Sequence, residues 1–261
     1  MMSGKLKNKI VIASGGTGGH IFPAISLSSY LKDKYHIKLT TDKRGKNYID
    51  NINQNFEIKL ISASTIFQKN PFKIVYSIFL ILFSIIESVI FLINFNPKII
   101  IGMGGYSSFP ICVAARVLRI PVIIYENNLV IGKANKYLLP IVNQIFLSFS
   151  ETKKINPKYK SKIFLSGSII RKEVENYKHI ADFNKEKIKI VIMGGSQAAE
   201  IFGTQLPRIF KKCQNNGINL SVVQQCLNSQ KEELTNFYKE KNIGNEVFTF
   251  RSDVTNIFKS A

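Results

Sequence analysis

Glycines, a histidine and nearby polar side chains are the residues whose types and spacing could do chemistry. The first group is Gly15-Gly-Thr-Gly-Gly-His20, which follows the apolar and mostly β-branched run 10–13. A strand that turns through glycines into a helix aims backbone N–H groups and the positive end of a helix dipole at an anion, usually phosphate. The pattern therefore predicts phosphate binding. The alternative is a glycine turn that only lets a helix pack close to a strand.

Two further glycine turns repeat this arrangement. Gly102-Met-Gly-Gly-Tyr106 follows the apolar run 99–101, and Gly194-Gly-Ser-Gln197 follows the predicted strand 188–193. In parallel sheets, ligands bind at the carboxyl ends of the strands. Three such turns, split between two α/β units, predict a binding cleft between two domains.

The titratable candidates near these turns are His20, Glu126 and Arg171. His20 could act as a general base near neutral pH, or it could cap its own helix. Glu126 ends a predicted strand and could be a base, an orienting carboxylate, a sugar-hydroxyl acceptor or a solvated loop acid. Arg171 is typical of a clamp for phosphate or carboxylate. The sequence has no Asp-x-Asp pair and no histidine–carboxylate cluster, so we expect no metal site.

Composition narrows the possible partners. The chain has 261 residues, 45% of them hydrophobic, and a formal net charge of +19. This length predicts one large or two medium domains with a real core. The charge is spread along the chain and indicates an anionic substrate, an anionic membrane surface, or AT-rich coding bias. No nucleic-acid recognition motif is present, so nucleic acid is not an expected partner.

The compartment is indicated by the cysteines and by the start of the chain. Cys112, Cys213 and Cys226 are scattered without metal-ligand or CxxC spacing, which is typical of a reducing compartment. The apolar run after the basic first residues is too short for a signal peptide. We therefore expect the protein to stay on the cytoplasmic side.

Strands and helices alternate along the whole chain. This order predicts the α/β class, with a doubly wound parallel sheet formed twice. We expect a first domain over 1–168, a linker over 169–184 and a second domain over 185–261. Only about three strands are predicted for the second sheet, so the second domain is expected to be incomplete.

The segment 74–95 is the one stretch that resembles a membrane helix. It is nearly all apolar and close to the ~20 residues that a spanning helix needs. Glu87 would be costly inside a bilayer, and the strand-and-turn pattern resumes directly after the segment. We therefore predict a crossover helix with an apolar face left over, lying in or against a membrane surface. A spanning helix is the alternative.

Four motifs in this order resemble the MurG family. They are Gly15–His20 with Pro23-Ala24, Gly102–Tyr106, Glu126-x-Asn128 with Asn135-Lys136, and Gly194–Gln197. That family comprises UDP-N-acetylglucosamine transferases that convert lipid I to lipid II in peptidoglycan synthesis. The resemblance implies a GT-B fold and inverting transfer without a metal or other cofactor. It further implies a UDP-GlcNAc donor, a lipid I acceptor and peripheral attachment to the cytoplasmic face of the inner membrane.

The resemblance also implies roles for single residues. His20 matches a histidine proposed as catalytic, and Glu126 matches a glutamate of the active cleft. Contacts to the donor sugar and the acceptor side of the cleft are implied for Thr17, Gly18, Gly19 and Asn128. Contacts to the donor nucleotide diphosphate are implied for Arg171, Ser196 and Gln197, and Arg251 takes the place of an isoleucine at the nucleotide base. The loops implied for the acceptor diphosphate contain Gly15, Gly16, Gly104, Gly105 and Tyr106.

The chain departs from the family pattern at several places. The family's His-Glu-Gln-Asn reads Tyr125-Glu-Asn-Asn128, and a glycine of its donor turn is Ala198. The chain ends before the family's Arg-x-Gly-Ala-x-Thr-x-x-Glu stretch, so we expect weak or lost activity. One alternative is an NAD(P)-dependent oxidoreductase with Asp42 as the ribose-binding acid. Another is a non-catalytic membrane-surface module that binds lipid I.

Overall fold

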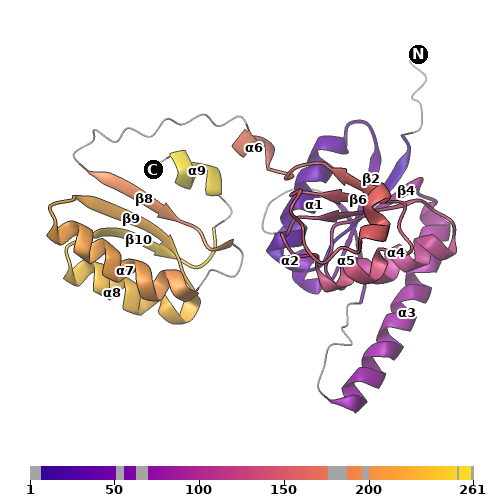
Figure 1. Ribbon diagram of the computed structural model, residues 1–261, viewed down its shortest axis with the longest axis horizontal. Helices are drawn as coiled ribbons and strands as arrows, with labels where there is room; N and C mark the ends of the chain where they lie inside the picture. The colour runs from indigo at the N-terminus through magenta and orange to yellow at the C-terminus, as the bar shows by residue number, and fades with distance from the viewer. Residues whose placement is uncertain are drawn as a thin grey trace. The chain divides into compact units, whose positions relative to one another are not determined.

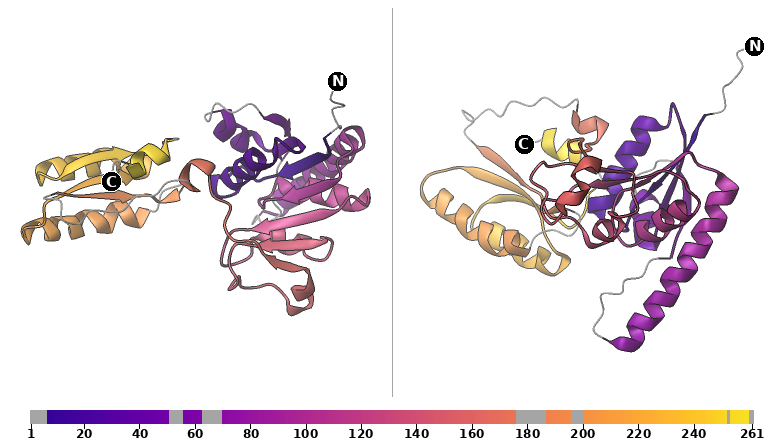
Figure 2. Two further views of the ribbon diagram at one scale, coloured as in Figure 1. Left: turned by 90° about the horizontal axis from the view of Figure 1, so that it is seen from above. Right: turned by 45° about the vertical axis from the view of Figure 1, so that its right-hand side comes forward.

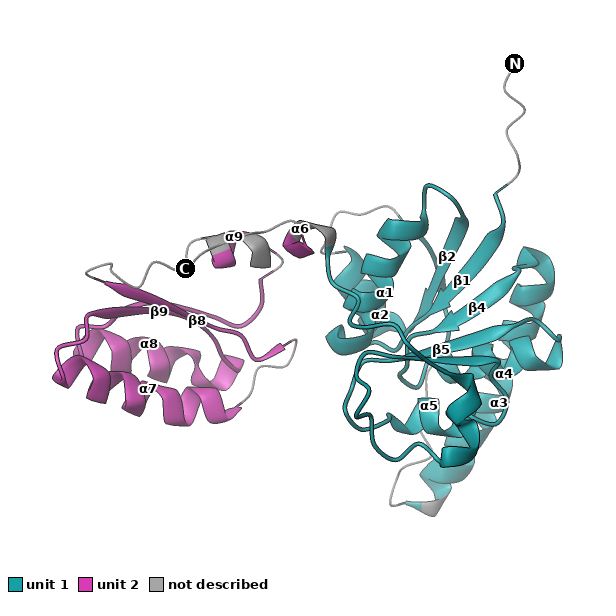
Figure 3. Ribbon diagram, turned by 45° about the horizontal axis from the view of Figure 1, so that its top comes forward, with its two compact units in different colours: residues 1–172 teal, residues 173–261 magenta. Residues whose placement is uncertain are grey.

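The computed structural model describes residues 7–50, 56–62, 70–175, 187–195, 200–251 and 253–259. The chain divides into two compact units, residues 1–172 and residues 173–261 (Figure 3). Each unit is a parallel sheet with helices packed on it (Figure 1). The predicted α/β class with two parallel sheets is confirmed.

Unit 1 contains a seven-stranded sheet of order β3-β2-β1-β4-β5-β6-β7. Its strands are β1 (Lys9–Ala13), β2 (His36–Thr41), β3 (Glu57–Leu60), β4 (Ile99–Gly102), β5 (Val122–Glu126), β6 (Gln144–Leu147) and β7 (Ile163–Leu165). Its helices are α1 (Gly18–Leu31), α2 (Lys43–Asp50), α3 (Pro71–Phe95), α4 (Ser108–Val117), α5 (Lys133–Leu138) and a 3-10 helix (Pro157–Lys162).

The strand order of unit 1 reverses between β1 and β4. The chain builds outward from β1 to β3, crosses back through α3, and then builds outward in the other direction from β4. β1 and β4 are parallel neighbours, with Ile10 beside Ile99 and Ala13 beside Gly102. The loops after these two strands therefore meet at the switch point, where doubly wound sheets bind their ligands.

Alternation along β1 divides the core of unit 1 into two layers. Ile10 and Ile12 pack with α1 and α2 on one face, and Val11 and Ala13 pack with α3, α4 and α5 on the other. Successive side chains of a strand point to opposite faces, and a strand covered on both faces is apolar throughout. This explains why the run 10–13 contains no polar residue.

Helix α3 runs from Pro71 to Phe95, where the sequence predicts a helix over 74–95. Asn70 caps its start, because its side-chain oxygen accepts a hydrogen bond from the Phe72 N–H at 2.9 Å. Part of α3 extends beyond the rest of unit 1 (Figures 1 and 2). By length and composition alone, the segment Phe72–Phe95 could cross a membrane, and 22% of its apolar window is buried.

Two faces of α3 differ in exposure. One stripe is buried in unit 1 and contains Ser77, Ser84, Ser88, Leu92 and Phe95. The exposed apolar face contains Phe72, Val75, Tyr76, Ile78, Phe79, Leu82, Phe83, Ile86, Ile90 and Ile93. The one acidic residue of the helix, Glu87, pairs with Lys59 of β3 at 2.6 Å. The negative charge of Glu87, which in the sequence counts against a spanning helix, is thus neutralised by a lysine of the sheet.

Unit 2 contains a three-stranded sheet of order β10-β9-β8. Its strands are β8 (Ile188–Ile192), β9 (Leu220–Gln225) and β10 (Gly244–Phe248), and its helices are α7 (Glu200–Asn215), α8 (Lys231–Glu240), α9 (Val254–Lys259) and a 3-10 helix (Asn228–Gln230). The short helix α6 (Lys172–Glu175) begins at the last residue of unit 1. The larger core cluster packs α7 and α8 on one face of this sheet. A smaller cluster packs Ile257 of α9 with Val223 and Phe248. The sheet is as small as predicted.

Candidate functional site

Two of the predicted glycine turns pack directly on each other in unit 1. The Gly15 N–H donates to the Gly104 carbonyl at 2.7 Å, and the Met103 N–H donates to the Ala13 carbonyl at 2.7 Å. The loop after β4 needs glycine because Gly104 and Gly105 have φ values of +88° and +82°. A Cβ added at Gly105 would lie 2.4 Å from the Gly15 Cα. The two loops therefore form one close-packed backbone layer.

Close packing explains several of the glycines predicted to bind a diphosphate. A Cβ at Gly15 would lie 2.6 Å from the Gly105 Cα, and one at Gly16 would lie 1.9 Å from Asp42 Oδ1. The Gly15 N–H already binds a carbonyl, so it is not available to a phosphate. Close packing, the alternative to phosphate binding, therefore explains why glycine stands at positions 15, 16 and 105.

The start of α1 is the part of this layer that is open to an anion. Thr17 is the N-cap of α1, and its side chain makes no capping hydrogen bond. Gly18 is buried, whereas Gly19 is exposed, and a Cβ at Gly19 would meet nothing within 4 Å. The first N–H groups of a helix have no partner within the helix, and the helix dipole is positive there. Glycine at 19 thus leaves room for a ligand beside these donors.

His20 lies against the glycine layer. A Cβ at Gly104 would lie 3.0 Å from His20 Nδ1, and one at Gly105 would lie 3.2 Å from His20 Cδ2. Nδ1 is buried and has no hydrogen-bond partner within the described part of the chain. Burial lowers the pKa of His20 below its ordinary 6.5, while the charge of Glu126 and a hydrogen bond to the Met103 backbone oppose that shift. The imidazole is therefore neutral at pH 7 and able to accept a proton.

Glu126 is completely buried at the end of β5. Its Oε1 accepts from the backbone N–H of Asn128 at 3.0 Å and from Asn128 Nδ2 at 2.8 Å. Its Oε2 accepts from the Gly132 N–H at 2.8 Å and from Asn135 Nδ2 at 3.0 Å. Of the alternatives for Glu126, a solvated loop acid is wrong, and the arrangement fits an orienting carboxylate that shapes the loop 126–135.

Two asparagines complete this part of the site, although residue types alone suggested no role for them. Asn127 Nδ2 donates to the Gly19 carbonyl at 2.6 Å and ties the loop after β5 to the start of α1. Asn135 Nδ2 donates to the Tyr125 carbonyl at 3.0 Å as well as to Glu126. The Asn135 Oδ1 is buried and without a partner among the described residues. In the sequence, the polar run after β5 was the one feature that could have indicated a role for these two asparagines.

Arg171 approaches the same region from the end of unit 1. Its guanidinium lies 4.5 Å from the centre of the Phe22 ring on α1. The segment before it is held by Tyr125, whose hydroxyl accepts from the Ile169 N–H at 3.0 Å and bonds Ser148 Oγ at 2.6 Å. Tyr125 stands where the MurG pattern has histidine, and here the phenol positions the segment that carries Arg171. Tyr106 is half-buried in the loop after β4.

The third glycine turn follows β8 in unit 2. The Gly194 N–H donates to Gln225 Oε1 at 3.0 Å, and Gln225 Nε2 donates to the Thr249 carbonyl at 3.1 Å. Gly195 has a φ of +74°, which favours glycine. The predicted contacts Ser196 and Gln197 lie outside the described residues.

Arg251, which replaces the isoleucine of the family pattern, is held by two carboxylates. Its Nε donates to Asp253 Oδ1 at 2.8 Å, and its guanidinium also pairs with Glu246. These contacts hold the guanidinium on the surface of unit 2 and raise its pKa, chiefly through the hydrogen bond to Asp253. A nucleotide base would meet an arginine that is already paired.

Asp42 was the acid required by the oxidoreductase alternative. Its Oδ1 accepts from the Arg44 N–H and from the Gly45 N–H, each at 3.0 Å. Its Oδ2 pairs with the Arg44 guanidinium at 2.8 Å. The carboxylate thus stabilises the start of α2. Both of its oxygens already have partners within the chain, whereas a ribose-binding acid needs an oxygen that is open to the ligand. Over the described ranges, no group of three His, Cys, Asp or Glu gathers as a metal site.

Two family signatures divide the sequence in the same order as the two sheets. Residues 10–147 match the glycosyltransferase family 28 N-terminal domain, and residues 189–261 match the glycosyltransferase family 28 C-terminal domain. The chain belongs to glycosyltransferase family 28. Within it, the chain is a MurG-like UDP-GlcNAc transferase, as its curated relatives indicate.

Two of these relatives carry the same description, UDP-N-acetylglucosamine--N-acetylmuramyl-(pentapeptide) pyrophosphoryl-undecaprenol N-acetylglucosamine transferase. The protein of Pelagibacter ubique is 32% identical over 256 residues, which cover 97% of this chain and 70% of that protein. The protein of Rickettsia bellii is 31% identical over 258 residues, which cover 97% and 71%. This family 28 chain thus spans about 70% of the length of these relatives.

Solved structures agree on the fold. The crystal structure of Acinetobacter baumannii MurG superposes with a TM-score of 0.67 at 23% identity, covering 97% of this chain and 71% of that one. A UDP-GlcNAc 2-epimerase from Neisseria meningitidis, bound to UDP-GlcNAc, superposes with a TM-score of 0.58 at 13% identity, covering 96% and 74%. This family 28 member therefore has the GT-B type of fold that its motifs implied.

Proposed function

We propose that this chain transfers N-acetylglucosamine from UDP-GlcNAc to the muramyl 4-hydroxyl of undecaprenyl-pyrophosphoryl-MurNAc-pentapeptide, so that lipid I becomes lipid II. The observation that carries the proposal is the neutral, half-buried His20 where two glycine loops meet, at the switch point of the sheet. The family membership supports glycosyl transfer, and the description of the relatives supports both the donor and the acceptor.

The reaction is a single displacement at the anomeric carbon of GlcNAc. The muramyl 4-hydroxyl oxygen attacks that carbon from the face opposite UDP, and its proton passes to His20. The bond from the anomeric carbon to the diphosphate breaks, and UDP leaves with the electron pair, which inverts the configuration. A histidine with a lowered pKa is unprotonated at neutral pH and is available to take that proton.

The predicted substrate contacts follow from this reaction. The open start of α1, with Thr17, Gly18 and Gly19, offers backbone donors to a diphosphate or a sugar. Asn128 is exposed next to the buried Glu126 and presents an amide to a sugar hydroxyl. Arg171 and the loop of Ser196 and Gln197 are proposed to hold the donor diphosphate. Arg251, paired as it is, is proposed to border the nucleotide base.

A peripheral position on the cytoplasmic face of the inner membrane is part of the proposal. The exposed apolar face of α3 runs from Phe72 to Ile93. An exposed apolar helix face gains free energy when it lies in the interface of a bilayer. The acceptor is a membrane lipid, so docking by α3 would bring the glycine loops to the depth of its diphosphate.

The test is a transfer assay with labelled UDP-GlcNAc and a water-soluble lipid I analogue, which removes membrane docking from the measurement. Transfer by the native chain above the background without enzyme, even if slow, supports the proposal, and His20→Gln should lower kcat by about 10²–10⁴-fold through loss of the base. His36→Gln is the matched control, because His36 is half-exposed at the opposite end of the same sheet. It should leave kcat unchanged.

Two outcomes contradict the proposal. Equal kcat for His20→Gln and the native chain would remove His20 from the chemistry. No transfer by a folded native chain that also shows no calorimetric binding of UDP-GlcNAc, with UDP-glucose as the control sugar nucleotide, would overturn the enzymatic function itself.

A further inference from the structure

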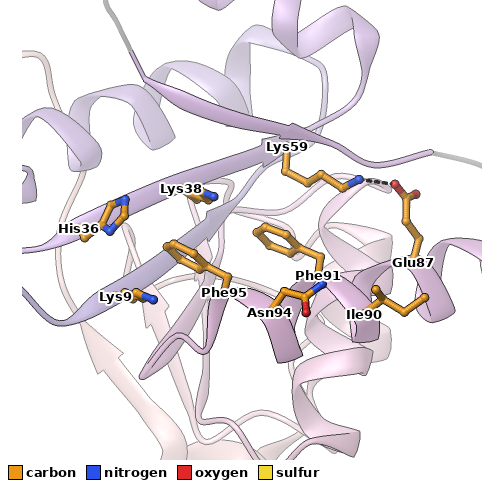
Figure 4. A pocket seen from close by; sticks show the side chains of 9 residues that line it. All are labelled: Lys9, His36, Lys38, Lys59, Glu87, Ile90, Phe91, Asn94 and Phe95. Carbon is orange, nitrogen blue, oxygen red and sulfur yellow. Dashed lines mark hydrogen bonds and ion pairs between the residues drawn. The ribbon is translucent and has the colours of Figure 1, made fainter.

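A cavity of about 500 Å³ lies between α3 and the seven-stranded sheet, and it begins at the amino ends of β1 and β2, away from the glycine loops. It is bordered by the first residues of β1 and β2, by β3 and by the last turns of α3 (Figure 4). Its polar lining is mostly cationic, with Lys9, Lys38, Lys59 and His36. The family 28 reaction proposed above uses none of these side chains.

The strand register explains why these cations gather. Lys9 pairs with His36 across β1 and β2, and Val11 pairs with Lys38, so these side chains share the face covered by α3. On β3, Lys59 pairs with Thr40 of β2, which continues the same face. Ammonium groups on the helix-covered face of a sheet are costly unless something compensates them.

The compensation on the protein side is incomplete. Lys59 pairs with Glu87 at 2.6 Å, and Lys38 pairs with Glu57 at 3.4 Å. Lys9 lies 5.3 Å above the Phe95 ring, and no ion pair links it to a carboxylate within the described ranges. Three ammonium groups thus face two carboxylates, and His36 adds further positive charge when it is protonated. The cavity favours an anion.

The rest of the cavity is apolar and continuous with the exposed face of α3. Phe91 and Phe95 stack with their ring centres 5.8 Å apart and form one wall. Ile90, also in the lining, belongs to the exposed apolar face defined above, and its side chain is 57% exposed. A ligand that fits must therefore carry an anionic group at one end and apolar chains that leave along α3.

We propose that this cavity binds the phosphoryl headgroup of an anionic phospholipid whose acyl chains lie along the exposed face of α3. The proposal rests on the membrane docking by α3 that is part of the proposed function. Lys9 and Lys38, which both stand over the Phe95 ring, supply the charge for the phosphate oxygens. The site is separate from the glycine loops, which lie at the carboxyl ends of the strands.

The test is co-sedimentation of the full chain with two kinds of vesicle, pure phosphatidylcholine and phosphatidylcholine with 30% phosphatidylglycerol. The double variant Lys9→Gln/Lys38→Gln should bind the anionic vesicles ~30-fold more weakly, at about fivefold per lysine. Binding to neutral vesicles should not change. The single variant Lys9→Gln, at a side chain with no carboxylate partner among the described ion pairs, should lose about fivefold.

The matched control is Lys158→Gln/Lys160→Gln. It removes the same charge and one ring contact, since Lys158 lies 5.0 Å above the Tyr159 ring. This control should lose less than about threefold. An equal loss in both double variants would overturn the pocket, because general surface charge would then explain the binding. Full competition by millimolar glycerol 3-phosphate would also overturn the lipid headgroup and identify a soluble phosphate ligand.

Failure of the pocket is distinguishable from failure of docking. Phe79→Gln/Phe83→Gln changes two exposed side chains of α3 and should abolish binding to both kinds of vesicle. If the native chain bound neither kind, the docking proposal would fail as a whole. If it bound both kinds equally, only the headgroup pocket would fail. Transfer to the soluble acceptor analogue is unaffected by either result.

Discussion

The two ends of the seven-stranded sheet present charge to a ligand in different ways. At the carboxyl end, the backbones of the loops after β1 and β4 pack directly on each other at Gly15 and Gly105. The hydrogen-bond donors available to a ligand there are backbone N–H groups at the start of α1. From the amino end along the face covered by α3, Lys9, Lys38 and Lys59 supply the charge from side chains. A site made of backbone cannot change without moving the chain, whereas side-chain cations can be replaced while the sheet stays intact.

Gly105→Ala tests the backbone end most severely. The new Cβ would lie 2.4 Å from the Gly15 Cα, at a φ of +82° that only glycine adopts easily. We expect a loss of about 2–4 kcal/mol in the free energy of unfolding, measured by urea denaturation, together with loss of transfer. Gly19→Ala is the matched control, because its Cβ would meet nothing within 4 Å. Equal urea midpoints for the two variants would show that the loops are not close-packed.

Glu126→Gln tests whether the stability of the loops at the carboxyl end of the sheet depends on a buried negative charge. The amide would turn an N–H donor toward groups that are themselves donors, such as the Gly132 N–H and Asn135 Nδ2. We expect a loss of about 1–3 kcal/mol in unfolding free energy. The carboxylate also raises the pKa of His20, so its removal should lower that pKa and move the acid limb of kcat/KM to lower pH.

The pH dependence of Glu126→Gln separates positioning from direct catalysis. A histidine whose folded pKa is lowered contributes stability above its ordinary pKa of 6.5 and loses it as the pH falls through the folded value. The loss of unfolding free energy due to His20 and the acid limb of kcat/KM should therefore both lie below pH 6.5 in the native chain. Both should lie at still lower pH in Glu126→Gln. An unchanged acid limb with a reduced kcat would instead assign Glu126 a role on the substrate.

Lys59→Met tests the side-chain end and should have the smallest effect on stability. Lys59 pairs with Glu87, but the two side chains are 37% and 29% exposed, so the pair is screened by solvent. We expect a change of less than about 1 kcal/mol in unfolding free energy by urea denaturation. A loss above ~2 kcal/mol would mean that the two ends of the sheet are equally constrained, and the comparison would fail.

The turns and most strands were predictable because each is encoded locally. The run 10–13 and the glycines after it sit together in the chain, and β1 was expected within one residue of its observed bounds. Helix α2 was not expected, because Lys43–Asp50 is polar and contains few apolar residues at helical spacing. Its start is stabilised by Asp42, whose position against Gly16 depends on the packing of two loops.

The sequence by itself determined the α/β class, the three glycine turns, the apolar helix and the MurG-like order of the motifs. Those features depend on residue types that stand close together in the chain. Only the tertiary structure decided that Gly15 and Gly105 pack against each other and that Glu126 is buried and accepts four hydrogen bonds. It alone also decided that the ammonium groups of Lys9 and Lys38 both lie over the Phe95 ring. The reason is that each of these contacts joins residues from different loops or strands, and parallel strand order, which the local pattern does not specify, brings them together.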